Sequence, residues 1–209
     1  MKRMLLATLL AAAIVVGVAA ASGGPSLLNP SSLHKKAPAT FKAKFVTTKG
    51  SYVITVHRSW GPIGADRFYN LVYYHYYDNE PIFRVLPAYI AQWGINMKPP
   101  IAKKWRYAFI KDEKGKHPNL KGMVDYAIAG TNSRTTQVFV NLRDNSPTFG
   151  PKFAPIGQVT KGMTVFHLLY HGYGERAQTN QLGMIKYGAW WVKKYFPKLD
   201  WIKTARIVH

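Results

Sequence analysis

Short β-type segments, separated by clusters of Gly, Pro and Asn, constrain the fold of this chain more than any other feature of its sequence. They cover residues 82–86, 89–93, 124–129, 138–141 and 156–159. Many short strands with turn residues between them are typical of closed barrels and sandwiches. The chain has 209 residues, 47% of them hydrophobic, and can bury one sizeable core, so we expect one mainly β domain with additions.

A hairpin and two helices are expected beside these strands. Residues 41–46 alternate between apolar side chains and mostly lysines, Lys49-Gly50 predicts a turn, and residues 52–57 form another β-type run. This order indicates a β-hairpin. Residues 65–74 carry apolar side chains at the i, i+3, i+4 spacing of one helical face, and residues 163–170 predict the second helix.

The region after residue 170 predicts one further helix over residues 181–196. Aromatic and apolar residues recur there at intervals of three and four, namely Met184, Tyr187, Trp191 and Tyr195, and Pro197 marks the end. The aromatic face of this helix has two interpretations, packing on the barrel or binding a partner, and we favour packing. Ile207-Val208 is expected to close the barrel.

The first 21 residues have the pattern of a secretory signal. Two cations, Lys2 and Arg3, precede an apolar run that ends in Ala19-Ala20-Ala21. An uncleaved membrane anchor is the alternative, because the run from Met4 to Ala21 has 18 residues and approaches the roughly 20 that span a bilayer. The small residues at the end favour cleavage, so we expect export to the periplasm or the extracellular space.

Composition predicts the remaining boundaries. Residues 22–40 are rich in Pro, Gly and Ser and are typical of a flexible linker. Residues 41–170 carry the predicted strands and the first two helices. Residues 171–209 are expected to pack on this domain as a C-terminal extension.

The charge of the chain is strongly positive, at +20 in total and +18 without Lys2 and Arg3. Such a charge favours anionic partners. Specific nucleic-acid binding is not favoured, because the cations are spread along the chain and no basic run exceeds two residues. We prefer the interpretation that an envelope protein carries this charge because it works at low pH or beside an anionic envelope surface of lipids and polymers.

Several chemistries are not supported by the sequence. The absence of cysteine excludes disulfides, thiolate nucleophiles and cysteine-ligated metals. The seven histidines show no metal-ligand spacing, and the nine acidic residues form no obvious acid/base pair. We therefore expect neither a metal nor a cofactor.

Two segments carry the functional signal. Residues 82–92 read Ile-Phe-Arg-Val-Leu-Pro-Ala-Tyr-Ile-Ala-Gln, and residues 127–140 contain Gln137 and Phe139 in a Gln-x-Phe pattern. Together they resemble the active-site strands of cyclophilins. The resemblance extends in order over residues 41–170. It implies a closed eight-stranded antiparallel barrel capped by two helices, and the activity of a peptidyl-prolyl cis-trans isomerase.

The resemblance also implies a set of site residues. Arg84 and Gln92 would be catalytic, with Arg84 stabilising the twisted Xaa-Pro amide. The substrate-binding residues would be Phe83, Tyr89, Ile90, Ala127, Ile128, Ala129, Gln137, Phe139, Phe149 and Phe153. Proline-containing polypeptides would be the partners, and we expect a monomer.

This sequence departs from the family pattern at several positions. Phe83 replaces a frequent histidine, and Ile128 replaces an asparagine that bonds the peptide. Thr148 stands in place of a tryptophan at the pocket mouth, so sensitivity to cyclosporin should be weak. Trp93 and Ile95 are also unusual and predict a reshaped loop over residues 96–107.

Two functions are consistent with these residues. The first is an exported isomerase that assists the folding of envelope or secreted proteins. The second is a cyclophilin-fold module that binds proline peptides, or acts as a chaperone, through its groove and basic surface without catalysis. The intact Arg84, Gln92 and Phe139 favour the first.

Overall fold

The structure is a computed structural model that describes residues 24–209 of the chain. The predicted signal over residues 1–21 lies outside the described residues. Within residues 24–209, no helix is both long and apolar enough to cross a membrane.

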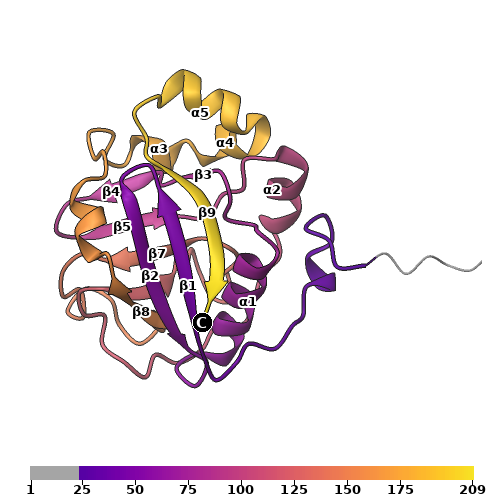
Figure 1. Cartoon of the computed structure of the whole chain (residues 1–209), viewed down its shortest axis with the longest axis vertical. Coiled ribbons are helices and arrows are strands. Elements are labelled where there is room, and N and C mark those ends of the chain that lie inside the picture. The colour runs from indigo at the N-terminus through magenta and orange to yellow at the C-terminus, as the bar shows by residue number, and fades with distance from the viewer. Residues whose placement is uncertain (1–23) are drawn as a thin grey trace, which may run out of the picture.

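A curled antiparallel sheet forms the body of the molecule (Figure 1). Nine strands are joined in the order β3-β9-β1-β2-β8-β6-β7-β5-β4. Their bounds are β1 Thr40–Thr47, β2 Gly50–His57, β3 Glu80–Pro81, β4 Arg84–Leu86, β5 Ile90–Trp93, β6 Met123–Tyr126, β7 Val138–Asn141, β8 Gly157–Lys161 and β9 Trp201–Val208. The prediction of a mainly β fold is therefore confirmed.

The two end strands of the sheet, β3 and β4, are separated along the chain by only Ile82 and Phe83. The sheet must therefore curl until its ends approach each other. The expected closed eight-stranded barrel is replaced by nine strands, and within residues 24–209 no ladder joins β3 to β4. The N–H of Ile82 donates to the carbonyl of Asp200, just before β9, so Ile82 still belongs to the β3 side of the sheet and the predicted strand over residues 82–86 begins only at Arg84.

The predicted hairpin is confirmed as β1 and β2. Its register places Phe45 opposite Tyr52, and their rings stack with centroids 5.0 Å apart. Both rings are fully buried and lie in the main core with Phe68 and Trp93. The alternation read in the sequence thus separates a core face from a lysine-bearing face.

Three helices differ from what the sequence predicts. Helix α1, Pro62–Tyr73, begins three residues before the predicted helix because Pro62 is suited to a first turn. The second predicted helix is a shorter 3-10 helix, η2, Met163–His167. The loop expected over residues 96–107 instead contains α2, Pro99–Trp105, which buries Ile101, Ala102 and Trp105.

Residues 24–39, part of the predicted flexible linker, follow a defined path and contain the 3-10 helix η1, Pro30–Ser32. Polar side chains of α1 bond their backbone: the Asn70 amide contacts both N and O of Lys35, at 3.0 and 2.7 Å. The Trp105 indole N–H donates to the carbonyl of Leu27 at 2.8 Å. The stretch is poor in apolar side chains, yet it is held through its main chain.

The C-terminal extension forms a second hydrophobic cluster against the body. It contains α3 Arg176–Thr179, α4 Gln181–Tyr187 and α5 Ala189–Tyr195. The buried members of the cluster are Phe83, Ile95, Met97, Ala177, Met184, Val192, Phe196 and Leu199. Residues 171–209, for which the name extension is kept, are therefore part of the body: they share this cluster with Phe83, Ile95 and Met97, and their strand β9 lies inside the sheet between β1 and β3.

The single helix predicted over residues 181–196 is interrupted at Gly188. This glycine has φ 65° and ψ −147°, a conformation that side-chain-bearing residues rarely adopt. A Cβ here would lie 2.3 Å from the carbonyl oxygen of Met97. The break allows α4 to pack beside α2 while α5 turns away.

Gly188→Ala should destabilise the protein by about 1–3 kcal/mol, because it adds backbone strain and a main-chain clash. The free energy of unfolding in urea measures this. Gly130→Ala is the matched control, since a Cβ there meets nothing within 4 Å. Equal stability of the two variants would contradict the role given to Gly188.

Candidate functional site

Strand register brings three of the predicted site residues into one row. Arg84 on β4 lies opposite Gln92 on β5, and Gln92 lies opposite Phe139 on β7. Residues directly opposite on neighbouring strands project on the same face. The backbone ladder alone therefore places a cation, an amide and an aromatic ring side by side.

A chain of side-chain hydrogen bonds runs through this row. Arg84 Nη1 donates to Gln92 Oε1 at 3.1 Å, Gln92 Nε2 donates to Gln137 Oε1 at 2.9 Å, and Gln137 Nε2 donates to Gln181 Oε1 at 2.7 Å. Gln92 and Gln137 each accept from one neighbour and donate to the next. The orientation of every group in the chain is therefore determined.

The C-terminal extension supplies both ends of this chain. Gln181 accepts the last bond, while Glu175 Oε1 accepts from Arg84 Nη2 at 2.6 Å. The Glu175 side chain is 49% exposed and that of Arg84 is 20% exposed, so the ion pair lies at the surface. Arg84 Nε is buried and has no hydrogen-bond partner among residues 24–209.

Glu175 and Gln181 were not among the predicted site residues. Gly172-Tyr173-Gly174-Glu175 has no spacing that links it to Arg84, and long-range ion pairs leave no periodic signal in a sequence. The unusual Phe83 and Ile95 did carry a signal, because both lie in the cluster that anchors the extension.

Aromatic rings lie together beside the row, and all four were predicted as pocket residues. Phe149 is 4.4 Å from Phe153, 5.3 Å from Phe139 and 5.6 Å from Tyr89, between ring centroids. Phe139 is buried and the other three are half-buried. They offer an apolar surface to a ring-shaped ligand group, next to Ile90, which is buried on β5.

Phe83 does not belong to this surface. Its side chain is fully buried in the second hydrophobic cluster, with Met184 and Phe196 of the extension. The prediction that Phe83 contacts substrate is therefore corrected. A histidine at this position would bury a polar ring, whereas phenylalanine suits the covered site.

The segment after β6 borders the site on another side. The N–H of Ala127 donates to the carbonyl of Gln137 at 3.0 Å, and Ala127 and Ile128 are half-buried. Ala129 is exposed, and its N–H donates to Ser133 Oγ at 2.8 Å. The main chain of this segment therefore stays beside Gln137 without the usual asparagine.

A cleft of about 480 Å³ continues from Gln137 between this segment and the extension. Its walls come from three parts of the chain, and they include Ala129, Ser133, Tyr107, Phe109, Leu182 and Ile185. The extension thus forms one wall of a groove that starts at the candidate site.

A network of buried polar side chains forms hydrogen bonds to the backbone of the candidate site at Tyr89. Asn145 Nδ2 donates to the carbonyl of Tyr89 at 2.9 Å and to Asn141 Oδ1 at 2.8 Å. Asn141 Nδ2 donates in turn to Asp125 Oδ2 at 3.0 Å. Burial raises the pKa of Asp125 to about 8, with the bond from Asn141 opposing the shift, so Asp125 is largely protonated at neutral pH.

Metal chemistry finds no support in this part of the chain. Among residues 24–209, no group of three or more His, Asp and Glu side chains is placed to hold a metal ion. What the site does offer is a fixed guanidinium, oriented amides and an apolar aromatic surface.

Comparison with known proteins gives consistent results. The family model described as "Cyclophilin type peptidyl-prolyl cis-trans isomerase/CLD" matches residues 42–186. "Peptidyl-prolyl cis-trans isomerase-like 1" of Gibberella zeae is 31% identical over 124 residues, which cover 56% of this chain and 74% of the relative. Its namesake from Aspergillus fumigatus is 28% identical over 128 residues, which cover 58% and 76% of the two chains.

Solved structures agree on the fold. A cyclophilin-type isomerase from Cryptosporidium parvum superposes with a TM-score of 0.63 at 15% identity, covering 81% of this chain and 98% of its own. A second crystal structure of that protein, determined in the presence of the dipeptide Ala-Pro, gives a TM-score of 0.62 at 16% identity, with 80% and 99% covered.

Titration of Asp125 should lower stability as pH rises. The unfolded chain loses this proton near pH 3.8, whereas the folded protein keeps it up to about pH 8. The contribution of Asp125 to the free energy of unfolding is complete below pH 3.8. It falls by up to about 1.4 kcal/mol per pH unit as the pH rises, until the folded protein also loses the proton near pH 8. Asp125→Asn should make this slope clearly shallower in urea unfolding between pH 5 and pH 7.5, and the buried Glu80, whose pKa is also raised by burial, should cause the slope that remains.

Asp144→Asn serves as the control for this measurement. Asp144 is exposed, and hydrogen bonds from Ser146 lower its pKa, so it does not titrate within that window. A slope as steep in Asp125→Asn as in the wild type would show that Asp125 does not cause it.

Proposed function

The chain belongs to the cyclophilin-type peptidyl-prolyl cis-trans isomerase family, and we propose that it accelerates Xaa-Pro isomerisation in exported proteins through Arg84. The observation that carries the proposal is the row of Arg84, Gln92 and Phe139 across three neighbouring strands. In this row a fixed cation stands beside an apolar surface. Those are the two features that the reaction requires.

The reaction makes and breaks no covalent bond. An Xaa-Pro amide resists rotation because resonance gives its C–N bond partial double-bond character, with a barrier of about 18–20 kcal/mol. Rotation localises a lone pair on the prolyl nitrogen. A catalyst therefore has only to bind the twisted amide better than the planar isomers, at about 1.36 kcal/mol for each tenfold of rate.

Arg84 would provide this differential binding. A guanidinium stabilises the localised lone pair more than the delocalised planar amide. Its Nη1 is held by Gln92, so the group needs little reorganisation as the amide twists. Gln92 and Gln137 are positioning residues here, because they act through the orientation of Arg84.

The aromatic surface would hold the proline ring. Tyr89, Phe139, Phe149 and Phe153 form an apolar site that disfavours the larger charge separation of the planar amide. Binding of the ring here leaves the prolyl nitrogen on the Arg84 side. The Cryptosporidium parvum relative was crystallised in the presence of Ala-Pro, which supports a proline-containing ligand for this chain.

Export is supported by the N-terminal sequence. Residues 1–21 combine two cations, an apolar run and a small-residue ending. In proteins that fold after crossing a membrane, Xaa-Pro bonds exchange between cis and trans in tens to hundreds of seconds when no catalyst is present. An exported isomerase would shorten that phase for its clients.

A non-catalytic binding module remains the second candidate, and one observation favours it. Glu175 accepts a 2.6 Å bond from Arg84 Nη2, so part of the guanidinium is already engaged. A peptide could then bind at the aromatic surface without meeting a free cation. The two functions differ in whether Arg84 is required for turnover.

Arg84→Ala should lower kcat/KM by about 10²–10³-fold, as loss of one preorganised donor to a transition state does elsewhere. The assay is cis-to-trans relaxation of an Xaa-Pro peptide at low temperature. Lys42→Ala, which removes one exposed cation from β1, is the control and should retain wild-type rates. Wild-type protein that shows no acceleration across several preceding residues would support the binding module.

Glu175→Gln should raise kcat/KM by up to about fivefold, because the carboxylate competes with the twisted amide for the same guanidinium. The gain should shrink with added salt, which screens a half-exposed ion pair. A fall in kcat/KM would instead show that Glu175 holds Arg84 in its working position.

A further inference from the structure

Large apolar side chains are exposed along the outer face of α4 and α5. They include Tyr187, Trp190 and Tyr195, with exposed fractions between 48% and 59%. Single exposed apolar residues need no explanation, but a contiguous group does. These side chains lie on two adjacent short helices at one end of the molecule (Figure 1).

Lysines join the aromatic rings into one surface, which we term the basic aromatic patch: Lys186, Tyr187, Trp190, Lys194 and Tyr195. The Lys186 ammonium lies 4.9 Å from the Tyr187 ring centroid, and the Tyr187 and Trp190 rings are 6.3 Å apart. Lys194 lies over both Trp190 and Tyr195, at 5.0 and 5.4 Å. The patch is therefore contiguous.

The charge around the patch has one sign. Residues 176–199 contain five cations, Arg176, Lys186, Lys193, Lys194 and Lys198, and no Asp or Glu. The acids that flank this stretch are occupied: Glu175 pairs with Arg84, and Asp200 accepts bonds from Thr48 Oγ1 and the Tyr170 N–H. The positive field of the patch is thus not neutralised by neighbours in sequence.

The opposite faces of the same helices are anchored. Met184 and Val192 are fully buried in the second hydrophobic cluster, beside Phe196. The aromatic side chains of the patch therefore remain outside because the inner positions are filled. The patch therefore belongs to helices that are packed on the body of the molecule.

We propose that the basic aromatic patch binds the surface of an anionic lipid bilayer. Trp and Tyr favour the interface, where the ring meets the acyl boundary and the polar end meets water. Lysines beside them attract anionic headgroups. Each helix is short, so the patch would lie on the membrane and not span it.

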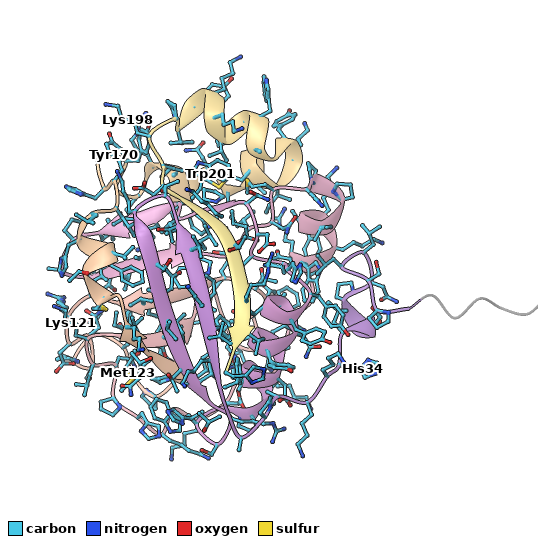
Figure 2. All side chains as sticks on the ribbon, viewed as in Figure 1. His34, Lys121, Met123, Tyr170, Lys198 and Trp201 are labelled. Atoms are coloured by element: carbon cyan, nitrogen blue, oxygen red, sulfur yellow. The ribbon has the colours of Figure 1, made fainter. Side chains whose placement is uncertain are left out.

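The N-terminal chain favours a membrane over other anionic partners. Leu27 lines the same cleft as Ala189 and Lys193 of α5, so the described N-terminal residues approach the patch end of the molecule. Figure 2 shows Lys198 at this end as well. The cations and the apolar run of residues 1–21 predict export across a membrane, which would bring the protein beside a bilayer. An anionic bilayer is therefore the partner that the predicted export would place within reach of the patch.

Flotation of the full chain with lipid vesicles tests the proposal. Vesicles of phosphatidylcholine are compared with vesicles that also contain phosphatidylglycerol. The patch variant Lys186→Gln/Lys194→Gln/Trp190→Ala should lose at least about tenfold of the affinity for the anionic vesicles. The control Lys42→Gln/Lys44→Gln/Leu120→Ala removes the same charge and an exposed apolar group from other places, and should lose less than about twofold.

All three proteins carry residues 1–23, so any binding through that segment is common to them. An equal loss in patch and control variants would overturn the proposal in favour of overall charge. Retention of vesicle binding by the patch variant, with loss of binding to polyglutamate, would assign the patch to an acidic polypeptide instead.

Direct contact is tested with a variant that keeps the fold. Trp190→Phe conserves an aromatic ring and removes one indole. Quenching of fluorescence by brominated anionic lipid should be stronger in wild type than in Trp190→Phe. Identical quenching would show that Trp190 does not enter the bilayer interface and would overturn the assignment.

Discussion

The backbone ladder of β4, β5 and β7 is the constraint on which the candidate site depends. It sets Arg84, Gln92 and Phe139 in one row before any side-chain contact is considered. A shift of one residue in either pairing would send these side chains to the other face. The hydrogen bonds among Arg84, Gln92 and Gln137 then orient groups that the register has already gathered.

The extension is integrated with this row and is not an appendage. Its helices cover Phe83, its Gln181 ends the chain of amides, and its Glu175 pairs with Arg84. The same segment turns a lysine and aromatic face outward. One region of about forty residues thus completes the core, borders the groove and forms a distinct surface.

Local patterns predicted much of the fold and of the candidate site. Alternation identified the β1–β2 hairpin, and the 3.6-residue period identified α1, because both depend on neighbours in sequence. The break at Gly188 and the burial of Phe83 depend on distant contacts, with the Met97 carbonyl and with the extension. Glu175 escaped prediction for the same reason, since it meets Arg84 across 91 positions of sequence.

The position of β9 has a consequence for how the chain acquires its structure. This strand follows all the others in sequence, yet it lies between β1 and β3 in the sheet. Until it arrives, β3 has no neighbour in the ladder and β1 has an open edge. The described sheet therefore cannot be completed before β9 has left the ribosome, and the edges of β1 and β3 stay unpaired and accessible until then.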